Sequence, residues 1–295
     1  TVSVLPFYYT YGASVLHTHL AVGARVVLED HLVYPHLVAE ALQRERATGF
    51  SGVPSTFALL LERGCLDRCD LSSLRYITQA GGAMAPALAN RVREAFPGAR
   101  LFVMYGQTEA SARLTCLAPE RLDDKPGSVG QGIAGVEIRV RREDGRDAAP
   151  GEQGEVWARG DNVMTGYWDN PEATTATLVD GWLRTGDLGY LDDDGYLFVS
   201  DRAKDMIISG GENVYPAELE NLINDLEGVA SVAVIGVPDE RWGEVPWAIV
   251  VAHPGARITT DAVRAHLDGR VARFKLPKNV VMVEDLPRTA SGKVK

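Results

Sequence analysis

Short apolar runs alternate with amphipathic segments through residues 1 to about 115, and this alternation indicates the first part of the fold. Residues 85–96 place Leu88, Val92 and Phe96 on one helical face, and residues 101–104 form a continuous apolar run. Such a run is typical of a strand buried on both faces of a parallel sheet. The segment is therefore predicted to be α/β and parallel.

The pattern of apolar and polar residues changes twice after this segment. From about residue 123 to 200 glycines are frequent and short strands alternate in polarity, which predicts antiparallel sheet or a small β-barrel. From residue 205 onward a compact α/β pattern returns, with its own apolar stripe and about 90 residues. We predict a mixed α/β and α+β chain. Its large domain comprises residues 1–203, with 1–115 α/β and 116–203 β-rich, and its small C-terminal α+β domain comprises 204–295. The charged segment 201–205 marks the boundary.

Composition excludes some classes of partner. The formal net charge is -10, from 40 acidic and 30 basic side chains. This argues against a nucleic-acid partner, because a phosphate backbone needs a basic surface. No apolar run approaches the roughly 20 residues of a membrane helix, and no signal-peptide pattern is visible. The three cysteines, Cys65, Cys69 and Cys116, suit a reducing compartment. We expect a cytoplasmic protein, although a chain that starts without Met can be an excised piece.

The run that begins at Gly181 contains the first residues to which a chemical role can be assigned. Asp187 follows a tight Thr-Gly turn, where its carboxylate can accept two hydrogen bonds from a vicinal diol such as a ribose. Arg202 lies fifteen positions further on, and its forked guanidinium can donate to the same sugar or its phosphate. Gly210 and Gly211, with Glu212, form a flexible loop just past the boundary.

Two further loops follow apolar strands, and ligands bind at the carboxyl ends of strands in open parallel sheets. In the run from Tyr105 to Glu109, Thr108 can bond a phosphate oxygen and Glu109 can hold Mg²⁺, which prefers oxygen ligands. Gly81 and Gly82 allow a backbone to approach a ligand closely. Near the end, Lys293 follows a glycine and can present its ammonium to charge that builds up on a phosphate.

Together these motifs resemble the adenylate-forming (AMP-binding) superfamily of acyl-CoA synthetases, firefly luciferase and peptide-synthetase adenylation domains. The resemblance covers the whole chain, with the motifs in the same order. It implies a large adenylation core followed by a small mobile domain that swings about a hinge at Lys204. It implies that Lys293, Thr108 and Glu109 are catalytic, with Glu109 holding the metal. The implied nucleotide-binding residues are Gly81, Gly82, Ala83, Tyr105, Gly106, Gln107, Thr108, Asp187, Arg202 and Lys293. Tyr8, Tyr9, Gly81 and Gly82 would line an acid pocket, and Gly210, Gly211 and Glu212 a tunnel for the thiol.

The implied function is the ATP- and Mg²⁺-dependent activation of a small carboxylic acid to an acyl-adenylate, followed by thioester formation with CoA. Two alternatives stay open: loading of the phosphopantetheine arm of a discrete carrier protein, and a nucleotide-binding fragment without catalysis. The superfamily's Ser/Thr/Gly-rich phosphate loop has no match in these residues, so we expect an upstream part that was removed or is a separate N-terminal half. The isolated chain is expected to bind AMP or an acyl-adenylate better than it turns over ATP.

Two other clusters favour plainer interpretations. Asp192, Asp193 and Asp194 lack the spacing of a calcium loop and predict a hairpin turn. His17 and His19 have no third ligand nearby in sequence.

Overall fold

The computed structural model describes residues 1–29, 32–202, 205–288 and 294, with the backbone alone at 201 and 202. By packing, the chain divides into two compact units. The first consists mainly of Thr1–Thr185 and Gly189–Val199, and the second mainly of Ser200–Thr289 with Gly186–Leu188.

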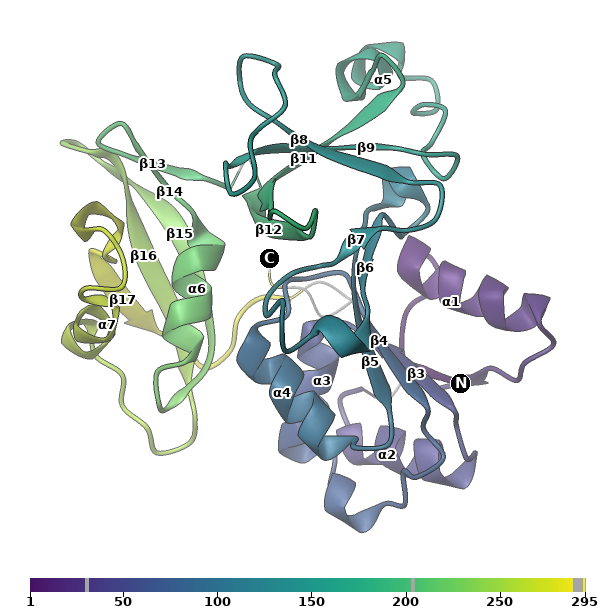
Figure 1. The fold of residues 1–295 in the computed structure, drawn as a ribbon. Coiled ribbons are helices and arrows are strands. Elements are labelled where there is room, and N and C mark those ends of the chain that lie inside the picture. Colours follow the sequence, from purple (N-terminus) through teal and green to yellow (C-terminus); the bar gives the residue numbers. More distant parts are fainter. Residues whose placement is uncertain (30–31, 203–204, 289–293, 295) are drawn as a thin grey trace. The chain divides into compact units, whose positions relative to one another are not determined.

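A mainly parallel sheet forms the centre of the first unit (Figure 1). Its strands are β1 (Val2–Ser3), β2 (Val27–Leu28), β3 (Gly49–Gly52), β4 (Tyr76–Gln79), β5 (Arg100–Tyr105), β6 (Thr115–Leu117) and β7 (Gln131–Gly132). Within the described residues the order across this first sheet is β2-β1-β3-β4-β5-β6-β7. β1 to β5 run parallel, whereas β6 and β7 are antiparallel additions at one edge.

Helices cover both faces of the first sheet (Figure 1). One face is covered by α2 (Pro35–Arg44), α3 (Pro54–Arg63) and α4 (Pro86–Ala95). Their apolar side chains pack with those of the strands in one core, whose largest fully buried members include Phe50, Phe57 and Ile77. The other face carries α1 (Thr10–Ala21), which packs through a smaller cluster. Buried Tyr11 of α1 also donates a hydrogen bond to the Thr78 carbonyl at 2.9 Å.

A second, antiparallel sheet completes the first unit. Its strands are β8 (Glu137–Arg141), β9 (Gly154–Arg159), β10 (Leu178–Val179), β11 (Trp182–Leu191) and β12 (Leu197–Arg202), and α5 (Pro171–Thr177) precedes β10. The order is β10-β11-β9-β8, and β12 also pairs with β11. One face of this sheet packs on the loop that follows β5, where Ala110, Leu114, Ala158 and Leu183 are completely buried.

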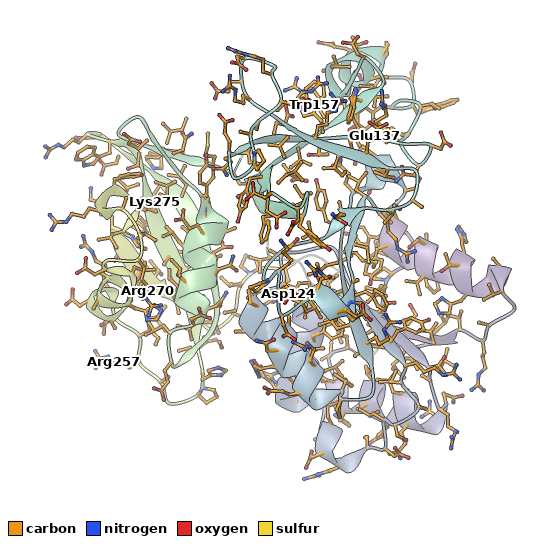
Figure 2. All side chains as sticks on the ribbon, viewed as in Figure 1. Asp124, Glu137, Trp157, Arg257, Arg270 and Lys275 are labelled. Carbon is orange, nitrogen blue, oxygen red and sulfur yellow. The ribbon has the colours of Figure 1, made fainter. Side chains whose placement is uncertain are left out.

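The other face of the second sheet is built from tryptophan and arginine. The Arg141 guanidinium lies 4.2 Å from the Trp157 ring centroid, and that of Arg159 lies 4.7 Å from the Trp182 ring. Arg159 also pairs with Glu137 at 2.7 Å. Figure 2 labels Glu137 and Trp157 on this sheet. Stacking keeps these rings buried while the arginines keep their charges in water, as amphipathic side chains commonly do.

The second unit contains a third sheet. Its strands are β13 (Ile207–Ser209), β14 (Glu212–Val214), β15 (Val229–Asp239), β16 (Gly243–Ala252) and β17 (Asn279–Met282), in the order β14-β13-β16-β15 with β17 on β16. Two helices, α6 (Pro216–Asn224) and α7 (Thr260–Leu267), share one core with β15 and β16. Leu219 and Ile223 of α6 and Val263 of α7 are completely buried there.

Local sequence explains several element boundaries. The helices α2 to α6 each begin with proline, whose fixed φ and missing N–H suit the first helical position.

The mixed α/β architecture predicted from sequence is confirmed. One detail differs, because β6 and β7 belong to the first sheet although the α/β segment was placed at residues 1–115. The antiparallel strands therefore begin within the first sheet, before the second sheet starts. Over the described residues, no helix is long and apolar enough to cross a membrane.

Candidate active site

The carboxyl ends of β4 and β5 lie side by side, because the two parallel strands pair Gln79 with Val103. The predicted glycine loop leaves β4 at this edge. Completely buried Gln79 donates from Nε2 to the Gly82 carbonyl at 2.8 Å, and Gly81 has a φ of +82°. Glycine is needed at the latter position, since that backbone region disfavours a side chain. The backbone conformation at Gly81 therefore sets the course of this loop, and the buried side-chain amide of Gln79 anchors it.

The loop after β5 doubles back on itself. A Cβ placed on Gly106 would lie 2.3 Å from the Ala112 carbonyl oxygen, so only glycine fits there. Ser111 and Ala112 have φ values of +51° and +78°, which are costly for residues with a side chain. Between them and Gly106 lies a short 3₁₀ helix, Thr108–Ala110, which presents two of the predicted site residues.

Helix α1 reaches this loop through a residue that the sequence did not single out. The Thr10 and Thr108 hydroxyl oxygens are 3.4 Å apart. The predicted acid-pocket residues Tyr8 and Tyr9 directly precede Thr10, and their ring centroids are 4.7 Å apart. The side chain of Tyr8 is 73% exposed, and that of Tyr9 is 39% exposed. The start of α1 and the loop after β5 thus meet at one edge of the sheet.

Glu109 is held by a second residue that sequence reasoning missed. The Tyr167 hydroxyl donates to Glu109 Oε1 at 2.8 Å, and the Met164 amide donates to the Glu109 carbonyl at 2.7 Å. Burial and, next, the Glu109 carboxylate raise the pKa of Tyr167. The phenol therefore stays protonated at neutral pH and donates to the carboxylate.

Two amide groups at this edge have spare hydrogen-bonding capacity. Gln79 Oε1 and Gln107 Nε2 are buried without a hydrogen-bond partner among the described residues. Buried polar atoms are normally satisfied, so such orphans suit a polar ligand. A single carboxylate, Glu109, also fits Mg²⁺, which is commonly held by one or two carboxylates together with substrate phosphates. In the described part of the chain no group of three or more acidic, His or Cys side chains forms a ready-made metal cage.

The predicted ribose residues lie on two paired strands. Asp187 is in the middle of β11 and is 7% exposed, and Arg202 ends β12, the strand that pairs with β11. Thr185 is anchored by its hydroxyl, which donates to the Val156 carbonyl at 2.7 Å. The Arg202 side chain lies outside the description, as do the predicted hinge residue Lys204 and the predicted catalytic residue Lys293.

The glycine pair of the second unit forms a tight turn. β13 and β14 pair Ser209 with Glu212, so Gly210 and Gly211 are the two residues of a hairpin loop. Their φ values of +63° and +87° are those of a type I′ turn, which favours glycine at both positions. Gly210 is also covered by Trp242, since an added Cβ would lie 2.7 Å from that ring.

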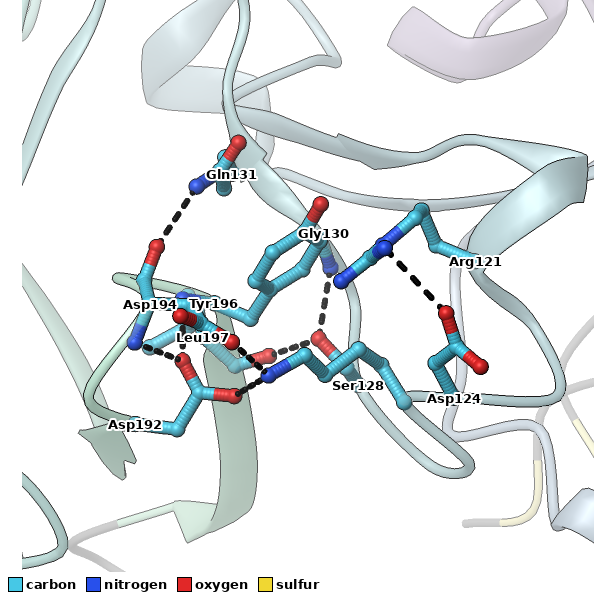
Figure 3. A network of polar contacts seen from close by, with 10 residues as sticks. Arg121, Asp124, Ser128, Gly130, Gln131, Asp192, Asp194, Tyr196 and Leu197 are labelled. Carbon is cyan, nitrogen blue, oxygen red and sulfur yellow. Dashed lines mark hydrogen bonds and ion pairs between the residues drawn. The ribbon is translucent and has the colours of Figure 1, made fainter.

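The acidic turn predicted from Asp192 to Asp194 is a hairpin turn between β11 and β12. Lys125 Nζ lies 2.7 Å from Asp192 Oδ2 and 2.5 Å from Asp194 Oδ2 (Figure 3). Asp192 also accepts hydrogen bonds from the amides of Asp194 and Tyr196. A lysine thus takes the place that a cation would have in a calcium loop.

In the histidine pair, His19 is engaged in protein contacts. His19 Nδ1 lies 2.7 Å from the Val15 carbonyl, and Nε2 lies 2.7 Å from the Tyr76 hydroxyl. Both ring nitrogens are therefore occupied, which fits the rejection of a metal at this position.

The fold and the residues at this sheet edge define an α/β protein with a polar ligand site at the carboxyl ends of parallel strands. The chain belongs to the family of AMP-binding enzymes. The model of that family matches residues 1–168, and the model of the AMP-binding enzyme C-terminal domain matches residues 218–293. The resemblance given by the motifs is thereby confirmed.

Relatives of established activity are similar over nearly the whole chain. Indoleacetate–CoA ligase of Aromatoleum aromaticum is 43% identical over 276 residues, which are 94% of this chain and 54% of that enzyme. Feruloyl-CoA synthase of an Amycolatopsis species is 44% identical over 92% of this chain and 55% of that enzyme. The chain thus spans about half the length of the curated relatives it matches.

Solved structures give the same result. The o-succinylbenzoate CoA synthetase of Bacillus subtilis, in complex with its acyl-adenylate intermediate, superposes with a TM-score of 0.87 at 36% identity. The match covers 99% of this chain and 59% of that one. The amide bond synthetase McbA of Marinactinospora thermotolerans superposes with a TM-score of 0.92 at 36% identity, over 99% of this chain and 60% of that one.

Proposed function

We propose that this chain is part of an AMP-forming acid–CoA ligase, which activates a carboxylic acid with ATP and transfers the acyl group to CoA. The observation that supports this best is the arrangement at the edge of the first sheet. The glycine loop after β4 and the Thr10–Thr108 pair lie there, Glu109 follows Thr108, and two buried amide atoms, Gln79 Oε1 and Gln107 Nε2, have no hydrogen-bond partner among the described residues. The similarity to CoA ligases over nearly the whole chain agrees with this arrangement.

Each site residue has a role in the proposed reaction. Thr108 would donate to a phosphate oxygen, and Glu109 would hold Mg²⁺ against the nucleotide phosphates, where the ion would offset their charge. Gly81, Gly82 and Ala83 would let the backbone approach the adenine and the acid, and Tyr105 would stack on the adenine. Attack by the acid carboxylate on the α-phosphate would then form the acyl-adenylate and release pyrophosphate.

The other proposed roles belong to residues on β11, β12 and beyond. Asp187 would accept hydrogen bonds from the ribose hydroxyls, and Arg202 would support them. Lys293 would stabilise the charge that develops on the α-phosphate. Attack by a thiol on the acyl-adenylate would release AMP, with Lys204 as the hinge between the two steps and Gly210, Gly211 and Glu212 along the thiol's path. The acid pocket would include Tyr8 and Tyr9.

The test is acid-dependent exchange between ATP and pyrophosphate, measured across aryl and aliphatic acids. It would use the chain itself and a polypeptide extended upstream to the length of the relatives. We expect exchange from the extended polypeptide, and a loss of about 10- to 100-fold for Glu109→Gln, the range typical when a metal site loses a partner. Lys293→Ala should abolish exchange. No exchange with any acid, while AMP still binds, would refute the ligase and favour a nucleotide-binding fragment.

The acceptor is identified by a second assay on the same polypeptide. Acyl-adenylate formed with the best acid is offered CoA, a phosphopantetheinyl carrier protein or an amine. We expect CoA to be consumed fastest. Faster transfer to the carrier protein would replace the CoA assignment with the loading of a discrete carrier.

A further inference from the structure

The segment that follows β9 fastens the 3₁₀ helix bearing Thr108 and Glu109. The Asn162 side-chain amide donates to the carbonyls of Ala110 at 3.0 Å and Arg113 at 2.7 Å. In return, the Ser111 hydroxyl donates to the Asn162 carbonyl at 2.9 Å. The backbone bond from Met164 to Glu109 and the side-chain bond from Tyr167 to Glu109 follow along the same segment.

This fastening offsets a local cost. Two consecutive non-glycine residues, Ser111 and Ala112, lie in the left-handed region, which is unfavourable for a residue with a side chain. Such a conformation persists where the surroundings over-determine it. The bonds from Asn162 reach both sides of the strained pair, at Ala110 and Arg113, so the loop is held in the shape that presents Glu109.

Tyr167 is itself held on its far side by α5. The Tyr167 amide donates to Thr174 Oγ1 at 2.9 Å, and Thr174 Oγ1 donates to the Asn170 carbonyl at 2.8 Å. Asn170 caps α5 by accepting from the Ala173 amide. The backbone of Tyr167, whose hydroxyl contacts Glu109, is therefore anchored to a capped helix.

The chemistry of the donor matters as much as its position. Over the described residues, no Lys, Arg or His forms an ion pair with the Glu109 carboxylate, and the side-chain contact to it is a neutral phenol. A cationic partner would cancel the charge that a metal ion needs. A neutral donor on one oxygen orients the carboxylate and leaves its negative charge available.

We infer that Tyr167 is a positioning residue for Glu109, holding this carboxylate in the orientation in which it receives the Mg²⁺ that accompanies ATP. The inference rests on the proposed function. It assigns Tyr167 no contact with substrate, and it makes the α5 segment part of the metal site's support.

The test measures metal binding without turnover. Mn²⁺ is titrated into the extended polypeptide with ATP but no acid, and bound metal is followed by the loss of the free Mn²⁺ electron paramagnetic resonance signal. Tyr167→Phe is expected to weaken Mn²⁺ binding about tenfold, as loss of a ligand's hydrogen-bond partner commonly does. Its affinity for AMP without metal should be unchanged. Thr174→Val, which removes the hydroxyl that accepts from the Tyr167 amide, should weaken Mn²⁺ binding in the same direction and by less.

The matched control is Tyr190→Phe. Tyr190 also has a partly buried ring, which stacks on Phe198 with centroids 4.9 Å apart, and its charged neighbour is Asp192 instead of Glu109. It should bind Mn²⁺ as the unsubstituted protein does. Equal affinity in Tyr167→Phe, Thr174→Val and the unsubstituted protein would overturn the inference alone. If the unsubstituted protein shows neither metal-dependent ATP binding nor exchange, the proposed function fails, and the inference with it.

Discussion

Gly130 occupies one of the most crowded backbone positions in the first unit. A Cβ there would lie 2.0 Å from the Cys116 carbonyl carbon and oxygen, and the φ of +88° is itself unfavourable for a side chain. The Gly130 carbonyl accepts from the Leu197 amide at 2.8 Å, so this crowding comes from close pairing of β6, β7 and β12.

We expect Gly130→Ala to destabilise the protein by more than about 3 kcal/mol, because a clash with backbone cannot be relieved by turning a side chain. Thermal or urea unfolding measures the effect. Gly145→Ala is the matched control: its φ is +81°, but no atom lies within 4 Å of an added Cβ. It should lose only about 1–2 kcal/mol, the cost of the left-handed backbone. Similar losses for both variants would contradict the packing argument.

At the scale of single residues, sequence predicted the positions of the loops better than the contacts of their side chains. The loops around Gly81 and Thr108 could be placed at the sheet edge because each follows an apolar strand. Tyr167 and Thr10 could not be found in this way. Tyr167 contacts a residue 58 positions away in sequence, and Thr10 contacts one 98 positions away. No local periodicity signals such a contact. The glycine at 106 was identified, but the carbonyl that requires it, from Ala112, was visible only in the structure.

Among the elements, the β11–β12 hairpin is fastened by Lys125. Its ammonium bridges Asp192 and Asp194 and lies 5.0 Å from the Tyr196 ring centroid. The pKa of Asp192 is lowered: burial opposes the charged form, but hydrogen bonds from Lys125 and from backbone amides outweigh it. Hydrogen bonds to the two carboxylates raise the pKa of Lys125.

These shifts give a pH window. The stabilisation from Asp192 is present above the ordinary carboxyl pKa of about 4 and is lost as the pH falls through its lowered folded value. The stabilisation from Lys125 is present below the ordinary lysine pKa of about 10 and is lost as the pH rises through its raised value. Lys125→Met should therefore lower the thermal midpoint at pH 7, and its deficit should shrink below about pH 3.

The control for this prediction is Arg100→Gln. Arg100 pairs with Glu120, and both side chains are about 60% exposed, at 59% and 62%. Exposed pairs contribute little, so its midpoint should stay near that of the unsubstituted protein at either pH. A deficit for Lys125→Met that is the same at pH 7 and pH 3 would show that lost packing, not charge, causes it.

Element boundaries were predicted well where proline or apolar periodicity marks them. The helical face predicted within residues 85–96 corresponds to α4, and the apolar run at residues 101–104 lies within β5. The edge strands β6 and β7 did not, because short polar strands such as Gln131–Gly132 acquire their identity from the neighbour they pair with.

For the molecule as a whole, the two compact units have separate apolar cores, which supports the proposal that a small domain follows a large one. The core of the first sheet contains Phe57, and that of the third sheet contains Leu219, both completely buried.

Leu219→Ala should cost its unit about 2–5 kcal/mol, and Phe57→Ala about 3–5 kcal/mol. Hydrogen–deuterium exchange distinguishes the units. Leu219→Ala should speed exchange in β15 and β16 and leave β3 to β5 protected, with the reverse for Phe57→Ala. Faster exchange in both units from either substitution would show one cooperative unit.

The strand order of the first sheet has a consequence for the way the protein is made. From β4 to β7, each strand pairs with the one synthesised just before it. A ribosome delivers the chain in that same order, so each new strand can dock on an edge that already exists. Such neighbour-by-neighbour growth keeps the unpaired edge short-lived and limits the time during which it can capture another nascent chain.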